Sequence, residues 1–364
     1  MATYPVAEIN LAALQHNFER VKQLAPNSKV MSVIKADAYG HGAIQVAQAL
    51  HASDAFAVAR VSEGLRLRAA GIQQPIVILE GVRALDDLHA AANNVLSLVF
   101  HHAFQLELLT SVQLNKPLSF CWLMLETGMH RLGLSCEQIE QALAVLKTSS
   151  NIEGNIGLMS HFANSDLIGD SRNQQQLDLL MESANQYGLA TSMANSAAIL
   201  SIEESHGEWI RPGIMLYGSS PFDDQSPQDL ALKPVMLLRS ELIAMHALNI
   251  GDSVGYGGNW TADKTGQVGI VSIGYGDGYS RHLSNVGSVV IHQQKVAILG
   301  RVSMDMIAID LSNVTEVAIG DEVILWGNDL LTVDDMAQKA NTISYELLCQ
   351  LNERVTRDYH HGQS

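Results

Sequence analysis

The chain has 364 residues, with 22 Lys plus Arg against 38 Asp plus Glu, and a formal net charge of −16. This acidic balance argues against a nucleic-acid or anionic-membrane partner, because such proteins carry positive patches. Apolar residues make up 47% of the chain and charged residues 16%, which excludes a disordered protein and allows a large core. The length predicts roughly two domains.

The cysteines and the N-terminus indicate a cytoplasmic protein. Cys121, Cys136 and Cys349 are odd in number and scattered, which is typical of reduced thiols rather than of a disulfide framework. No Cys-x-x-Cys pair suggests zinc, and we expect no metal site. The N-terminus has no basic region followed by an apolar run, so we expect no signal peptide. No segment approaches the ~20 apolar residues of a membrane span.

The first predicted helix follows Asn10, a plausible N-cap, because apolar residues recur at Leu11, Leu14 and Phe18. A β-branched run at 30–34 then predicts a buried strand that ends at Lys35. Strand-like and helix-like stretches alternate from there to about residue 220. Eight strands are predicted in all, at 30–34, 55–59, 76–80, 95–100, 118–125, 156–160, 189–194 and 214–218.

Eight alternating units predict an α/β protein with a (β/α)8, TIM-like barrel over residues 1–230. A doubly wound open sheet is the alternative, because strand counts from sequence err by one or two. After about residue 230, short β-rich runs lie between glycine clusters. This pattern predicts a mostly β C-terminal domain over 231–364, with helices at 331–340 and 345–352.

Polar residues stand where the predicted barrel strands end, which is where barrel enzymes place their catalytic groups. Lys35 closes the first strand, Arg131 follows the fifth and His161 closes the sixth. A lysine in apolar surroundings has a lowered pKa, and its neutral amine can form a Schiff base or act as a base. The alternative is a lysine whose ammonium reaches solvent along its aliphatic stem.

A phosphate site is predicted after the seventh and eighth strands, where barrels often bind phosphate. Asn195 and Ser196 follow the seventh strand, and Gly213 and Ile214 lie at the eighth. Ordinary turn chemistry is the alternative reading of these residues. A lysine that faces a phosphate cradle suits pyridoxal phosphate, whose aldehyde condenses with an amine.

Eight motifs together give a specific resemblance. The chain resembles the alanine racemases, the barrel-type pyridoxal-phosphate racemase family, along essentially its whole length. The matching segments are 33–42 (VIKADAYGHG), 127–133 (TGMHRLG), 194–196 (ANS), 211–214 (RPGI), 254–257 (VGYG), 274–279 (GYGDGY), 301–305 (RVSMD) and 344–346 (SYE).

The resemblance implies two catalytic bases that interconvert L-alanine and D-alanine. Lys35 would hold the cofactor as an aldimine and handle the α-proton of the D-enantiomer. Tyr256 of the partner subunit would be the base on the opposite face, so a homodimer with shared active sites is implied. Two opposed bases suit racemisation, because a proton leaves one face and another returns to the other.

The resemblance also implies the roles of the remaining residues. Arg211 would face the pyridine nitrogen, His161 would lie beside the ring, and Arg131 would bind the phenolic oxygen and approach the substrate carboxylate. Met304 of the partner would line the substrate pocket. Residues implied to hold the phosphate are Tyr39, Ser196, Tyr345 and the backbone of Gly213 and Ile214, and Asn195 is also expected to bind the cofactor. Residues implied to line the access channel are Asp166, Tyr275, Arg281 and Arg301.

One position departs from the family pattern. Many members carry a carbamylated lysine where this chain has Met124, and Glu126 replaces the usual aspartate. Methionine carries no charge, so the anionic group beside Arg131 is missing. We therefore predict that a chloride ion or water lies beside this arginine.

Three alternatives remain open from the sequence. The first is a broad-specificity amino-acid racemase of the same fold. The second is a barrel-type decarboxylase, which would need a cysteine acid in the β domain, where Cys349 lies outside any matching motif. The third is a non-catalytic pyridoxal-phosphate carrier, against which the long stretch 231–364 argues, because a carrier of this kind lacks the β domain.

Overall fold

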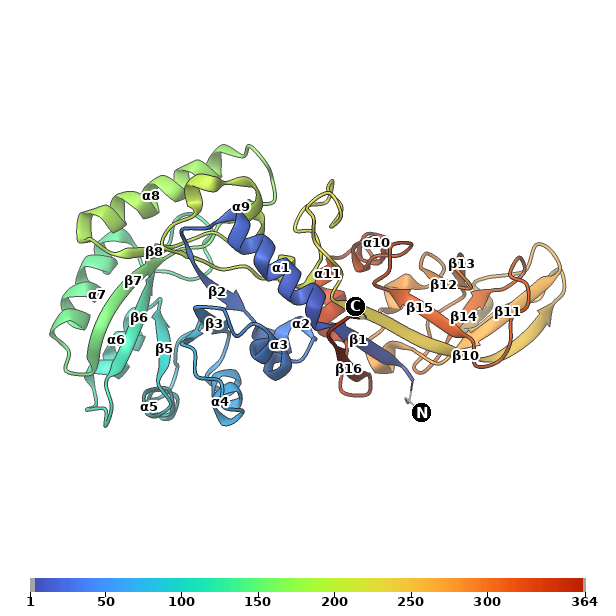
Figure 1. The fold of residues 1–364 in the computed structure, drawn as a ribbon, viewed down its shortest axis with the longest axis horizontal. Helices are drawn as coiled ribbons and strands as arrows, with labels where there is room; N and C mark the ends of the chain where they lie inside the picture. Colours follow the sequence, from blue (N-terminus) through green and yellow to red (C-terminus); the bar gives the residue numbers. More distant parts are fainter. Residues whose placement is uncertain (1–3, 363–364) are drawn as a thin grey trace.

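The computed structural model describes residues 4–362. It contains a closed barrel of eight parallel strands and a separate eight-stranded sheet, which lie on the left and right of Figure 1. This arrangement confirms the predicted barrel followed by a mostly β part, and it rules out the open doubly wound sheet. No helix in the described part of the chain is long and apolar enough to cross a membrane.

The barrel closes where its last strand pairs with its first, Lys29 opposite Trp209 and Val30 opposite Ile210. Seven of the eight predicted barrel strands are present. The strands are β2 (Lys29–Val33), β3 (Ala55–Val58), β4 (Ile76–Ile78), β5 (Leu96–Phe100), β6 (Leu118–Met124), β7 (Ile152–Met159), β8 (Ala190–Ser192) and β9 (Trp209–Ile210).

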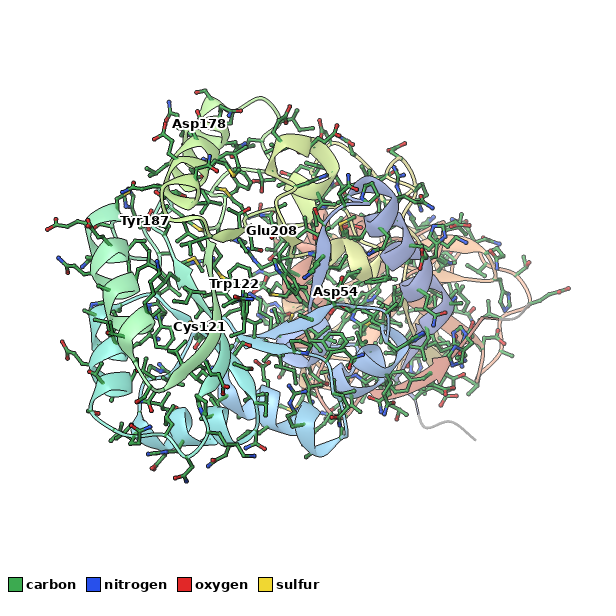
Figure 2. The ribbon with its side chains drawn as sticks, turned by 60° about the vertical axis from the view of Figure 1, so that its left-hand side comes forward. Asp54, Cys121, Trp122, Asp178, Tyr187 and Glu208 are labelled. Atoms are coloured by element: carbon green, nitrogen blue, oxygen red, sulfur yellow. The ribbon has the colours of Figure 1, made fainter. Side chains whose placement is uncertain are left out.

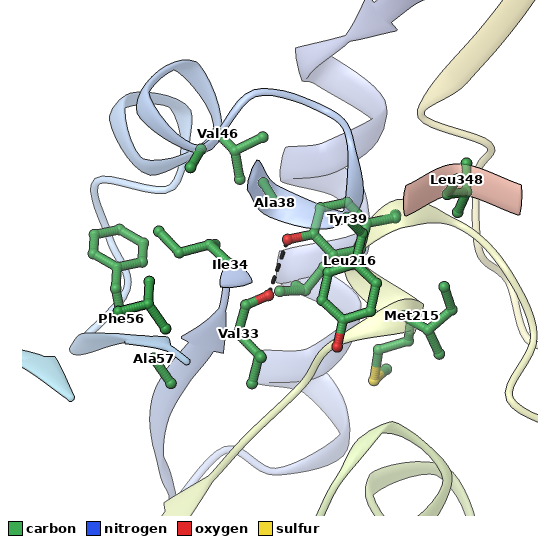
Figure 3. Close-up of a cluster of buried hydrophobic side chains, with 14 of the residues drawn as sticks. Val33, Ile34, Ala38, Tyr39, Val46, Phe56, Ala57, Met215, Leu216 and Leu348 are labelled. Carbon is green, nitrogen blue, oxygen red and sulfur yellow. Dashed lines mark hydrogen bonds between the residues drawn. The ribbon is translucent and has the colours of Figure 1, made fainter. Parts of the chain in front are cut away.

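The eighth predicted strand, 214–218, is wrong. Ile214–Tyr217 forms a 3-10 turn, η2, and the strand is the two-residue β9 just before it. A short buried apolar run does not distinguish strand from helix by its pattern. The turn is fixed by Gly218 at φ 77° and by the Tyr217 hydroxyl, which donates to Val33 O at 2.9 Å, the dashed line in Figure 3.

Helices surround the barrel, and their ends follow the sequence signals. Helix α1 (Leu11–Leu24) begins at the predicted cap, because Asn10 Oδ1 accepts from Ala12 N and Ala13 N, each at 3.0 Å. Helix α8 (Ser171–Tyr187) ends at Gly188 in the left-handed conformation. The others are α3 (Ala43–Ala49), α4 (Val61–Ala69), α5 (Leu85–Asn93), α6 (Ala103–Thr110), α7 (Cys136–Thr148) and α9 (Ser196–Ser201).

The second sheet contains strands from both the N-terminal and the C-terminal parts of the described chain. Its order is β11-β14-β13-β12-β15-β10-β1-β16, and β1 pairs antiparallel with β10 and parallel with β16. Neither β1 nor β16 is predicted by the sequence pattern, and the division at residue 230 stays a prediction. The strands are β1 (Val6–Asn10), β10 (Met236–Leu248), β11 (Gly266–Val271), β12 (Ser288–Ile291), β13 (Gln294–Leu299), β14 (Ile307–Asp310), β15 (Glu322–Trp326) and β16 (Thr356–His360).

The two parts meet at the loop that follows the first barrel strand. Helices α10 (Val333–Lys339) and α11 (Ser344–Gln350) pack on each other, and α11 packs on the short α2 (Lys35–Tyr39). The Arg357 guanidinium donates to Gly40 O at 3.1 Å. Leu348 of α11 lies in the same buried cluster as Val33 of β2 (Figure 3). The C-terminal residues therefore reach the end of the barrel that carries Lys35.

Candidate active site

A cavity of about 850 Å³ lies at the carboxyl ends of the barrel strands. Ten of the twelve predicted site residues line it, and Asp166 of the predicted access channel does so as well. Tyr256 and Met304 do not line it, and the two residues are 72% and 53% exposed. The ten are Lys35, Tyr39, Arg131, His161, Asn195, Ser196, Arg211, Gly213, Ile214 and Tyr345.

The chain turns sharply after Lys35 through a left-handed segment. Residues 36–39 have φ between 52° and 55°, a conformation that costs an L-residue about 1–2 kcal/mol. Glu63 holds the segment at its start, because its Oε1 accepts from Ala36 N at 2.7 Å. Asp37 Oδ1 accepts from Ala43 N at 3.0 Å. Strain that the surroundings enforce is typical of functional sites, and here it lets both Lys35 and Tyr39 line the cavity.

The amine of Lys35 is set toward its neutral form. Burial lowers its pKa, and the Arg131 guanidinium lowers it further. The nearby Glu63, Cys349 and Glu80 act in the opposite direction but do not cancel the effect. A neutral amine can attack an aldehyde or accept a proton, so this environment supports the predicted role of the lysine.

A buried cation and a neutral histidine lie side by side in the cavity wall. Arg211 is 5% exposed, and it donates to Ser192 Oγ at 2.7 Å and to Ser160 O at 2.5 Å. Burial lowers the pKa of Arg211 to about 10, which leaves it charged at neutral pH. Burial lowers the pKa of His161 to about 3, with smaller contributions in the same direction from the basic side chains of Arg211, Arg131 and Lys35. The neutral ring places Nδ1 at 3.4 Å from Arg211 Nη2.

A second group of polar residues that line the cavity lies around Ser196. Ser196 Oγ accepts from Gly213 N at 2.9 Å and from Met215 N at 3.3 Å. Asn195 caps α9, because its Oδ1 accepts from Ala198 N at 3.1 Å. Asn195 therefore fixes the position of Ser196, and its direct contact with a cofactor stays a prediction.

The residues of this cavity fit pyridoxal phosphate. A Cβ added at Gly213 would lie 2.7 Å from the Tyr39 hydroxyl, so the backbone is left bare where that hydroxyl approaches. Burial raises the pKa of Tyr39 and of Tyr345, so both phenols stay protonated and can donate. Hydroxyl and bare backbone groups suit a phosphate, and the amine of Lys35 suits the aldehyde.

A small space lies beside Arg131, next to Met124, the position at which the chain departs from the family pattern. A cavity of about 30 Å³ lies among side chains that include Met124 and Arg131. Glu126 turns to Gly128 N and His130 instead. Within residues 4–362 no hydrogen bond or ion pair of the Arg131 side chain is formed. The space is large enough for one water, and its occupant stays a prediction.

Sequence reasoning missed residues that act on the site through others. Gln176 Nε2 donates to His161 O at 3.1 Å and to Thr127 Oγ1 at 3.0 Å, which ties two strand ends together. Glu63 and Cys349 were also missed. Glu63 carried a signal, because it is the third residue of α4, and a glutamate there can accept from the N-cap backbone, as its Oε2 does from Arg60 N at 3.0 Å.

Comparison with known proteins identifies the family. A sequence model of the alanine racemase N-terminal domain matches residues 9–221, and one of the C-terminal domain matches residues 235–359. The chain belongs to the alanine racemase family. The alanine racemase of Nitrosococcus oceani is 45% identical over 354 residues, which are 97% of this chain and 99% of the relative. That of Vibrio parahaemolyticus is 44% identical over 96% of this chain and 98% of its own length.

Solved structures of the family have the same fold. The biosynthetic alanine racemase of Pseudomonas aeruginosa superposes with a TM-score of 0.92 at 40% identity, covering 99% of this chain and all of that one. The alanine racemase of Acinetobacter baumannii superposes with a TM-score of 0.91 at 42% identity over the same shares. The predicted family resemblance is confirmed, and membership makes the chain a pyridoxal-phosphate-dependent isomerase.

Proposed function

We propose that this chain is an alanine racemase that interconverts L-alanine and D-alanine with pyridoxal 5'-phosphate, and that Lys35 and Tyr256 are its two bases. One observation carries the proposal. Lys35, with a lowered pKa, shares a single cavity with the polar cradle of Tyr39, Ser196 and Gly213, in a chain of the alanine racemase family.

The cofactor would supply one piece of chemistry, which is to acidify the α-proton of the bound amino acid by drawing off the charge that its loss leaves. The chain's own residues would do the rest. The Lys35 amine would take or return the α-proton on one face of the substrate. The Arg131 guanidinium would bind the substrate carboxylate. The charged Arg211 keeps a cation beside neutral His161, and cannot itself accept a proton.

The second base would come from another copy of the chain. Tyr256 and Met304 are largely exposed and lie outside the cavity of their own chain, which supports a role in a neighbour's site. A homodimer accounts for both residues if each subunit contributes Tyr256 and Met304 to the active site of the other, because the two subunits make equivalent contacts across a two-fold interface. Cytoplasmic location is part of this proposal, and the free thiols of Cys121, Cys136 and Cys349 support it.

A mixing experiment tests the proposal. Lys35→Ala and Tyr256→Phe variants should each lose racemisation of L-alanine. When they are unfolded together and refolded, half of the dimers should be mixed, and one of the two sites in each mixed dimer would hold both native bases. Activity should return to about a quarter of the wild-type value. No recovery, with dimers present by light scattering, would contradict the shared site.

A further inference from the structure

A second cavity lies at the other end of the barrel and shares no lining residue with the first. It encloses about 200 Å³ among the amino-terminal halves of the strands, and its lining includes Met31, Val77 and three aromatic residues. Figure 2 shows Trp122 within the ring of barrel strands. We call this second cavity the lower cavity, and the cavity that contains Lys35 the upper cavity. Phe120, two positions before Trp122, lines the lower cavity, and Met124, two positions after Trp122, lines the upper cavity.

Aromatic side chains form one wall of this lower cavity. The rings of Phe120 and Trp122 meet edge to face with centroids 5.1 Å apart, and those of Trp122 and Trp209 are 6.2 Å apart at 89°. The small residues Ala55 and Ser97 lie elsewhere on its lining and leave the space open. An apolar cavity of ~150 Å³ binds benzene in another protein, so this one has room for one aromatic ring with a substituent.

Ser97 places an unpartnered hydroxyl in this cavity. Its residue is only 4% exposed and lines the cavity, in register with Val77 on the neighbouring strand. Within residues 4–362 its hydroxyl makes no hydrogen bond. By contrast, the buried hydroxyl of Ser53 donates to Ser32 Oγ at 2.8 Å. A hydroxyl that lines a cavity without a protein partner can bond to a ligand group or to water, and the buried Trp122 Nε1, which also lacks a partner, is a second polar group at this cavity.

A fixed cation stands at the same cavity. Arg68 lines it, while no Asp or Glu does, and no carboxylate of residues 4–362 lies within ion-pair distance of this arginine. Val95, also in the lining, is 54% exposed and has φ 53°, a strained conformation for a β-branched residue. The guanidinium is held by backbone carbonyls, those of Ile72 at 2.6 Å, Gln74 at 2.8 Å, and Asn94 and Val95 at 3.0 Å each.

We propose that this lower cavity binds a small aromatic carboxylate, with its ring against the aromatic wall and with Arg68 and Ser97 as its polar contacts. The aromatic wall selects a planar ring. The cation without an acidic partner selects an anion over a neutral or positively charged analogue. The site is separate from the one that takes the cofactor and alanine.

Three probes of one shape test the proposal on the holoenzyme. Benzoate, benzyl alcohol and benzylamine share a ring and differ in charge. Trp122 and Trp209, two of the four tryptophans, line the cavity, so intrinsic fluorescence reports on occupancy. Benzoate should give a saturable change and bind about tenfold more tightly than the alcohol or the amine. Saturating alanine should leave its affinity unchanged.

Variants locate the binding. Ser97→Leu fills the cavity and should weaken benzoate about tenfold while racemisation stays unchanged. Ser97→Ala, a smaller change, should also weaken it and serves if the leucine variant does not fold. Arg68→Met should remove the preference for the anion, whereas Arg83→Met, at an exposed arginine, should not. The proposal is overturned by no saturable signal, by equal affinity for the three probes, by displacement with alanine, or by variants of Ser97 that bind benzoate as the wild type does.

Discussion

The contact between Gly213 and Tyr39 gives a measurable steric effect. In a Gly213→Ala variant the new Cβ would lie 2.7 Å from the Tyr39 hydroxyl and 3.5 Å from the ring carbon that bears it. The first distance is an overlap, and the second is ordinary contact. Overpacking of this kind costs about 1–3 kcal/mol of the free energy of unfolding. For a chain of 364 residues this corresponds to a fall in Tm of about 1–4 °C.

A double-mutant cycle isolates this overlap from the strain that alanine meets in the backbone of residue 213. Gly213→Ala is made in the wild type and in Tyr39→Phe, and unfolding of the apoprotein in urea is measured for all four proteins. Most of the loss should disappear in the Tyr39→Phe background, because the hydroxyl is gone. Titration of the apoproteins with pyridoxal phosphate should show weakened binding in Gly213→Ala. An equal loss of stability in both backgrounds would refute the steric reasoning.

Three further outcomes are expected. Burial lowers the pKa of His41 from 6.5 to about 4, so the neutral ring is favoured in the folded protein. The full stabilisation from this shift is present above pH 6.5, and the free energy of unfolding falls by roughly 3 kcal/mol as the pH drops to 4. His41→Gln should make the free energy of unfolding less dependent on pH between 6.5 and 4, and an unchanged pH dependence would contradict the reasoning. The Glu63 carboxylate accepts from three backbone N–H groups, and its charge raises the pKa of Lys35. Glu63→Gln removes this charge and should lower the pKa of Lys35, so the pH profile for reconstitution of the apoprotein with cofactor should move to lower pH. A shift to higher pH would refute the assignment. If chloride lies beside Arg131, the activity of the wild type should depend on the chloride concentration. The Met124→Glu variant should lose that dependence, because its carboxylate would take the place of the chloride. If neither protein depends on chloride, water is the occupant.

Most of the barrel could be predicted from local sequence patterns. The alternation of buried strands with amphipathic helices depends on short stretches of sequence, so seven strands are found where the pattern places them. Strand β9 has only two residues, too few for any periodicity, and its position depends on pairing with β2 and β8. Strands β1 and β16 pair with each other across nearly the whole chain, which no local signal reveals.

Some site residues could also be predicted from local sequence patterns, and others could not. Lys35, Arg131 and His161 follow predicted strands, so the barrel rule alone brings them to one end. Glu63 lies on a helix, and its role is visible only when the loop after β3 meets the loop after β2. The family resemblance, and not the fold of one chain, singles out Tyr256, because the residue lies outside the cavity of its own chain.

The pairing of β1 with β16 has a consequence for synthesis on the ribosome. Strand β1 is synthesised long before β16, and it cannot complete its pairing until β16 follows, since β1 lies between β10 and β16 in the finished sheet. The barrel strands are complete by Ile210, long before that partner exists. The loop after Lys35 receives its hydrogen bond from Arg357 only when the final residues arrive. Residues 356–360 therefore complete both the sheet and the support of the lysine loop, and a nascent chain that has not yet reached them would carry the barrel strands with an unfinished active site.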